Sequence, residues 1–121
     1  MNEELEELLE KLLGDYSDAI GIAFQSLELP IASHYGEKTD ILEKYKDIPM
    51  MSIDESFNTS FNFIITEGGT IVIFFIKNLH FISVFVKNEM PNKELALRIY
   101  QKYAPKFEQL INRLYEAEKI H

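Results

Sequence analysis

The sequence predicts an α+β domain in which a single five-stranded antiparallel sheet is flanked by helices, in the order α-β-β-α-β-β-β-α. Three observations lead to this prediction. Leucines recur at helical spacing near the N-terminus, three apolar segments separated by short turns fill residues 57–87, and a long helical stripe of apolar residues follows. Short turns between consecutive strands favour an antiparallel meander.

Composition narrows the class of protein. The 121 residues suit one domain, residues 1–121. The net charge of −8 disfavours nucleic-acid binding and adhesion to anionic lipid, because both need a basic surface. The chain has no cysteine, which fits a reducing cytoplasm, and its longest apolar run, residues 71–76, is far shorter than the ~20 residues of a membrane span. We therefore expect a cytoplasmic protein that binds no nucleic acid and does not insert into a membrane.

The N-terminal third predicts one helix and two strands. Residues 5–13 carry leucines at i, i+3, i+4, i+7 and i+8, so one stripe faces the core, and Gly14 is expected to end this helix. Residues 19–26 alternate as a strand, and residues 31–35 return as a second strand that Gly36 ends. The two faces of the first strand are Ile20, Ile22 and Phe24 on one side and Ala19, Gly21 and Ala23 on the other. The small side favours close approach by a helix.

A short second helix and an apolar loop are predicted next. Thr39 or Asp40 can cap a helix that carries Ile41, Leu42 and Tyr45, and Pro49 limits its length. The loop that follows contains four large apolar residues, Ile48, Met50, Met51 and Ile53. These residues either fill the core or face a partner, and the sequence favours neither alternative.

Residues 57–87 predict a three-strand meander, and a helix closes the chain. In residues 57–66, Phe57, Thr59, Phe61, Phe63 and Ile65 share one face, opposite Asn58, Ser60 and Asn62. The glycine pair in residues 67–70 predicts a tight hairpin. Residues 71–76 are apolar on both faces, which is typical of an interior strand, and residues 79–87 form the next strand. The last helix opens at Pro91 or Asn92, and Pro105 should kink or split it.

We expect one shared core and no catalytic centre. The predicted core comprises Leu5, Leu9, Leu12, Ile22, Phe24, Ile73, Phe75, Val84, Phe107, Leu110 and Leu114. The three histidines, His34, His80 and His121, are scattered, and the glutamates of residues 3–10 suit the exposed side of a helix better than a metal site. Gly68-Gly69-Thr70 lacks the lysine of a phosphate loop. The sequence therefore predicts a protein that is not an enzyme, with no catalytic residues, no metal and no cofactor.

The segments together resemble the roadblock/dynein light chain family, from residue 5 to about residue 114. Four passages carry the likeness: the leucine helix leading into the strand at residues 19–23, the turn to Pro30-Ile31, the meander with its glycine hairpin at residues 61–87, and the terminal amphipathic helix. The resemblance implies a profilin-like α/β architecture with the strand order 2-1-5-4-3. It also implies a non-catalytic module that acts as a platform or regulator for Ras-like small GTPases, for dynein cargo complexes or for prokaryotic motility systems.

The same resemblance implies dimerisation through the second helix and the third strand. The interface residues would be Ile41, Leu42, Tyr45, Met50, Met51, Phe57, Ser60 and Phe61. The strand at residues 57–66 has a polar outer row and follows a long loop, as an edge strand would, and an open edge can pair with a second copy. We expect a homodimer or a heterodimer with a related chain, and a small GTPase as a further partner.

Two other functions stay open at this point. One is a small-molecule-sensing domain of the profilin-like or PAS-like kind, and the other is a longin-like trafficking domain, although longin domains normally begin with a strand. A buried cavity with convergent polar groups would favour the sensor, whereas two-fold pairing of edge strands would favour the scaffold.

Overall fold

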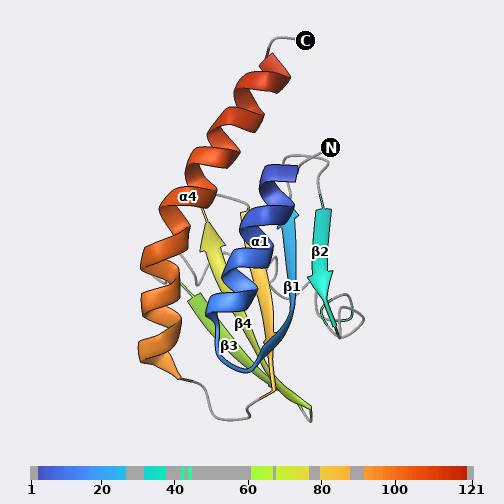
Figure 1. Ribbon diagram of the computed structural model, residues 1–121, viewed down its shortest axis with the longest axis vertical. Helices are drawn as coiled ribbons and strands as arrows, with labels where there is room; N and C mark the ends of the chain where they lie inside the picture. The colour runs from blue at the N-terminus through green and yellow to red at the C-terminus, as the bar shows by residue number, and fades with distance from the viewer. Residues whose placement is uncertain are drawn as a thin grey trace.

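The fold is one antiparallel sheet whose first and last helices lie on the same side. A computed structural model describes residues 3–26, 32–37, 42, 44, 61–66, 68–76, 80–87 and 92–119. The elements are α1 (Glu3–Asp15), β1 (Ala19–Ser26), β2 (Ala32–Gly36), β3 (Phe61–Thr66), β4 (Gly69–Ile76), β5 (His80–Val86) and α4 (Lys93–Lys119) (Figure 1). The strands lie in the order β2-β1-β5-β4-β3, which confirms the predicted fold class and strand order. Of the predicted second helix, Leu42 and Lys44 are described and helical, and its other residues lie outside the described part.

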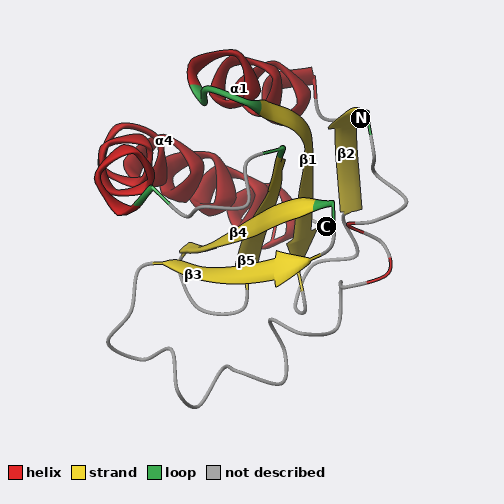
Figure 2. Cartoon of the chain, turned by 90° about the horizontal axis from the view of Figure 1, so that it is seen from below, coloured by secondary structure: helices red, strands yellow, loops and turns green. Residues whose placement is uncertain are grey.

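Two apolar clusters lie on opposite faces of the sheet. Helices α1 and α4 cover the same face, as Figure 2 shows, and we call the cluster beneath them the helix-side core. It consists of Leu5, Leu9, Leu12, Tyr16, Ile22, Phe24, Val72, Phe74, Ile76, Ile82, Val84, Val86, Ala96, Ile99, Tyr103, Ala104, Phe107, Leu110 and Ile111. The far-side cluster on the other face consists of Leu42, Ile71, Ile73, Phe81 and Phe85. Strand β4 contributes to both, so it is the interior strand that its continuous apolar run predicts.

The prediction of a single core is wrong at two of its residues. Ile73 is buried in the far-side cluster, and Phe75 is partly buried against the same cluster. Their even-numbered neighbours in β4 face the helices instead. The reason is that every residue from 71 to 76 is apolar, so the alternation of side chains gives no indication of which set faces the helices. Leu114 lies at the margin of the helix-side core and is partly buried.

A β-bulge at Ile20 overturns part of the face assignment predicted for β1. Ala19 pairs with Val86 and Gly21 with Phe85, so Ile20 is an extra residue at the point where the register shifts. Ala19 consequently packs against the helix-side core, whereas Ile20 packs against the far-side cluster. A bulge reverses the alternation on one side of itself, and the prediction assumed an unbroken period of two.

The ends of the two helices differ in how well the sequence predicts them. Helix α1 runs past Gly14 to Asp15, and the chain turns at Asp18, whose φ is 66°. At the start of α4, the Leu95 N–H donates a hydrogen bond to Asn92 Oδ1 at 3.1 Å, which confirms Asn92 as the cap. Helix α4 does not split at Pro105. The Gln101 residue whose carbonyl loses its donor is exposed, so water can replace the missing bond.

Candidate functional site

Of the eight predicted interface residues, the structure describes two. Leu42 lies over the far side of the sheet, and Phe61 opens β3. The other six lie outside the described residues; they are Ile41, Tyr45, Met50, Met51, Phe57 and Ser60. The described part of the candidate interface is therefore mainly β3 and its surroundings.

Leu42 is buried in its own chain. Its side chain is 4% exposed, in the far-side cluster with Ile71 and Ile73. Leu42 Cδ1 would lie 3.8 Å from a Cβ atom placed on Gly21, so the small side of β1 admits this residue closely. A charge at Leu42 would disturb the chain's own packing as well as any contact with a partner.

Strand β3 lies at the edge of the sheet, as the sequence predicts. It pairs with β4 only, and no described strand pairs with its other edge. The ring of Phe61 turns inward, with its centroid 6.1 Å from that of Phe74 and 6.4 Å from that of Tyr100. What β3 offers a partner is therefore the row of backbone N–H and C=O groups that pairs with no described strand, rather than the Phe61 ring.

Ile65 is an exposed apolar residue on this strand that the sequence did not single out. Its side chain is 64% exposed. The alternating pattern places Ile65 on the same face as Phe61 and Phe63, which are partly buried against the helix-side core. Ile65 precedes the β3–β4 hairpin, which projects beyond the start of α4 (Figure 1). The only signal in the sequence is that Ile65 lies close to the Gly68-Gly69 turn, at the end of its strand.

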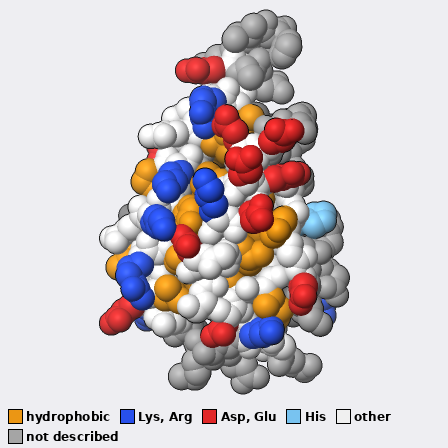
Figure 3. Space-filling model, viewed as in Figure 1, with side chains coloured by type: hydrophobic (Ala, Val, Ile, Leu, Met, Phe, Trp, Pro, Cys, Tyr) orange, Lys and Arg blue, Asp and Glu red, His pale blue; other side chains and the backbone are white. Residues whose placement is uncertain are grey.

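Charged side chains join α4 to α1 on the outer face of the molecule. Basic side chains gather over α4 and acidic ones over α1, as Figure 3 shows. Lys102 Nζ lies 2.7 Å from Asp15 Oδ2, and an Arg113 guanidinium nitrogen lies 2.8 Å from Glu4 Oε2. The hydrogen bond from Lys102, and then that from the Tyr103 hydroxyl, lower the pKa of Asp15. These pairs are exposed and individually weak, and they tie two helices of the same chain together.

Two tyrosines of the helix-side core should make the folded state less stable at alkaline pH. Burial raises the pKa of Tyr16 to about 12, and burial followed by the hydrogen bond to Asp15 raises the pKa of Tyr103. An unfolded tyrosine ionises near its ordinary pKa of 10.0, whereas the folded chain keeps both protons to higher pH. The unfolded state then binds fewer protons than the folded state, so alkali favours unfolding.

We therefore expect the urea midpoint of unfolding to be flat up to about pH 9.5 and to fall steadily above it. Circular dichroism between about pH 8 and pH 12 measures it. The Tyr16→Phe variant, which has no hydroxyl to ionise at this position, should show a shallower fall. A midpoint that stays constant through this range in the parent protein would contradict the prediction.

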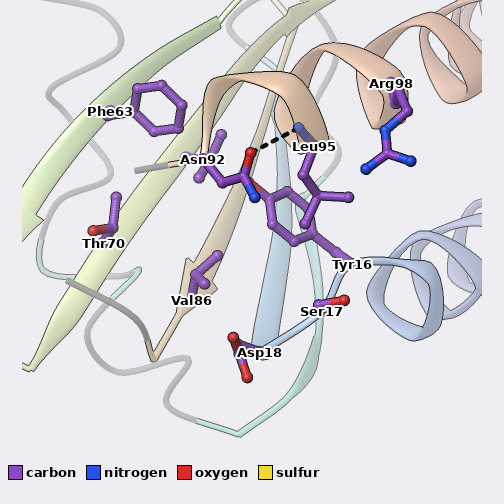
Figure 4. Close-up of a pocket in the computed structure, with 10 residues that line it drawn as sticks. Tyr16, Ser17, Asp18, Phe63, Thr70, Val86, Asn92, Leu95 and Arg98 are labelled. Carbon is purple, nitrogen blue, oxygen red and sulfur yellow. Dashed lines mark hydrogen bonds between the residues drawn. The ribbon is translucent and has the colours of Figure 1, made fainter. Parts of the chain in front are cut away.

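A pocket of about 220 Å³ lies where the sheet, the turn after α1 and the first turns of α4 meet (Figure 4). Its buried lining is Tyr16, Thr70, Val72 and Val86, its partly buried lining is Phe63 and Leu95, and its exposed rim is Ser17, Asp18, Asn92 and Arg98. Sequence reasoning did not find this pocket, because its residues come from five separate elements and turns. Only the folded topology brings them together.

The described residues offer little else to chemistry. They contain no group of three His, Asp or Glu side chains placed to hold a metal ion. His34 is exposed, while His80 is buried with its Nε2 3.3 Å from the Tyr115 hydroxyl, and His121 lies outside the described part. No helix among these residues is long and apolar enough to cross a membrane.

Comparison with solved structures identifies the fold. No protein-family model matches the sequence, and no curated protein matches it. MglB of Myxococcus xanthus superposes with a TM-score of 0.66 at 12% identity, over 92% of this chain and 97% of that one. MglC of the same organism gives 0.61 at 12% identity, over 87% and 97%. A roadblock/LC7 domain of Streptomyces avermitilis gives 0.56 at 10% identity, over 84% and 95%. The chain therefore has the fold of a roadblock/LC7 domain.

Proposed function

We propose that this protein is a non-catalytic, dimerising scaffold or regulatory module that serves a Ras-like small GTPase or a motility or trafficking complex. The observation that carries the proposal is the roadblock/LC7 fold with β3 at an open edge of its sheet. The family resemblance adds the class of partner. The two Myxococcus xanthus structures, MglB and MglC, share this fold over most of their length.

The open edge gives dimerisation a physical basis. Unpaired backbone groups on an exposed strand can be satisfied by the same strand of a second chain, and two-fold symmetry then joins two sheets into one. Ile65 adds exposed apolar surface on the same strand. The resulting two-fold dimer would present two copies of its surface to a partner. This arrangement suits a scaffold better than it suits an enzyme with a single catalytic cleft.

We expect the purified protein to sediment as a dimer at micromolar concentration, and the Ile65→Asp variant to shift toward the monomer. An Asp at this edge would be present twice across a two-fold axis, so its charges would oppose each other. Because Ile65 is 64% exposed, the change should leave the fold of the monomer intact. Sedimentation velocity at several protein concentrations measures the effect.

The matched control is Leu97→Asp, which adds the same charge at another exposed apolar residue, 45% exposed, on α4. It should leave the dimer unchanged. A parent protein that remains monomeric at about 100 μM would remove the homodimer and leave pairing with a related chain. The partner class is tested by measuring whether Ras-like GTPases of the source organism bind the dimer differently in their GTP and GDP states.

A further inference from the structure

We propose that the pocket between the turn after α1, the sheet and the start of α4 binds a small organic carboxylate with a short apolar body. This ligand site goes beyond the scaffold function, and it does not depend on the dimer. Figure 4 shows the lining side chains, with Tyr16, Ser17 and Asp18 from the turn, Asn92 just before α4, and Leu95 and Arg98 from α4 itself.

The strongest indication is the hydroxyl of Thr70. Its residue is 1% exposed, and Thr70 Oγ1 has no hydrogen-bond partner in the described part of the chain. Thr70 lies on the helix-facing side of β4, two residues before Val72, so its side chain belongs to the pocket wall. By contrast, Thr66 at the same hairpin donates its hydroxyl to the Gly69 carbonyl at 2.9 Å. A buried polar group without a partner is costly, and a ligand oxygen would satisfy it.

The remaining buried lining selects an apolar body. Val72 and Val86 are buried in the pocket wall, and Phe63 and Leu95 are partly buried in it. The volume of the pocket is about 220 Å³. That room suits a molecule of about the size of benzoate or hexanoate, with its ring or chain on the valines.

The α4 side of the rim favours a negative charge. The N-terminus of a helix carries a partial positive charge, and Asn92 uses its Oδ1 to cap Leu95, which leaves its amide N–H groups as donors. Arg98 adds a guanidinium on the following turn. Asp18 is the opposing charge, and it is exposed at the other side of the rim. A carboxylate would therefore lie beside the Asn92 amide, between Thr70 and Arg98, which Figure 4 shows on opposite sides of the lining.

Titration of the isotope-labelled full chain with sodium benzoate and sodium hexanoate tests the site by NMR. We expect saturable shifts of the amide signals of Thr70, Val86 and Leu95, with a Kd of the order of 1 mM, as suits ligands of this size. Benzamide, which is uncharged and of nearly the same shape as benzoate, should bind about tenfold more weakly. If neither acid shifts these signals saturably, or if benzamide binds as well as benzoate, the proposal is overturned.

Four variants assign the binding to its residues. Thr70→Val keeps the shape and removes the unpaired hydroxyl, so it should melt at a higher temperature yet bind benzoate about tenfold more weakly. Arg98→Gln should weaken the binding of benzoate but not that of benzamide. Asp18→Asn removes the opposing charge and should strengthen the binding of benzoate. Asn also adopts the φ of 66° found at this position, so the turn is kept. Thr66→Val, outside the pocket lining, is the control and should bind as the parent does. Unchanged benzoate binding by both Thr70→Val and Arg98→Gln would overturn the proposal.

Discussion

Replacing Phe107 with alanine is expected to lower the free energy of unfolding by about 3–5 kcal/mol. The side chain of Phe107 is 0% exposed and belongs to the helix-side core, where α4 packs over the sheet beside α1. Truncation removes the transfer free energy of the ring and leaves a cavity. The surroundings can fill that cavity only in part, because hydrogen-bonded strands and two helices hold its walls.

Urea unfolding followed by circular dichroism measures this loss, and two other substitutions calibrate it. Leu97→Ala, on the same helix but 45% exposed, should change stability by less than about 0.5 kcal/mol. The loss of stability for Phe75→Ala should lie between these two values. Phe75 is only partly buried, on the opposite face of the sheet, where its ring makes an edge-on contact with Phe81 at a centroid distance of 5.5 Å. If Phe107→Ala cost no more than Leu97→Ala, the helix-side core would be wrongly placed.

Features that depend on local chemistry could be predicted from the sequence. The paired glycines at residues 68–69 predict a hairpin, and β3 and β4 indeed pair from Thr66 and Gly69 onward. Pro91 or Asn92 predicts the start of α4, and the structure shows Asn92 as the cap, whose side-chain oxygen accepts a hydrogen bond from the first turn. The alternation of residues 19–26 predicts β1 with its observed bounds. In each case neighbours along the chain supply the whole signal.

Features that depend on how distant parts of the chain pack together could not be predicted from the sequence. In β4, both sets of alternate side chains can be buried, and only the position of α1 and α4 decides that Val72 and Phe74 face the helices while Ile73 faces away. The bulge at Ile20 depends on the partner strand β5. The pocket is a third case. In the sequence Thr70 is an ordinary hairpin residue, and it lines a pocket only because the fold places Asn92 and Tyr16 beside it.

The second large effect is expected from Gly21→Ala, which should cost about 3 kcal/mol of stability. A Cβ atom at this position would lie 2.0 Å from the carbonyl oxygen of Glu37 and 3.3 Å from its carbonyl carbon. Both are backbone atoms, so no rotation of a side chain relieves the clash. The backbone is also held in place, because the Glu37 N–H donates to the Ile20 carbonyl at 2.6 Å, next to the bulge.

Gly14→Ala is the matched control for this prediction. Gly14 lies within α1, and a Cβ atom there would have no atom within 4 Å. Alanine should therefore stabilise the protein by about 0.5–1 kcal/mol through its better helix propensity. If the two variants change the free energy of unfolding in opposite directions, the loss at Gly21 comes from the close approach of the backbone to β1. It then does not come from the conformational entropy that any glycine carries. Equal stabilisation by both would mean that β1 and the Glu37 backbone do not meet as described, and the small side of β1 would then lack its structural reason.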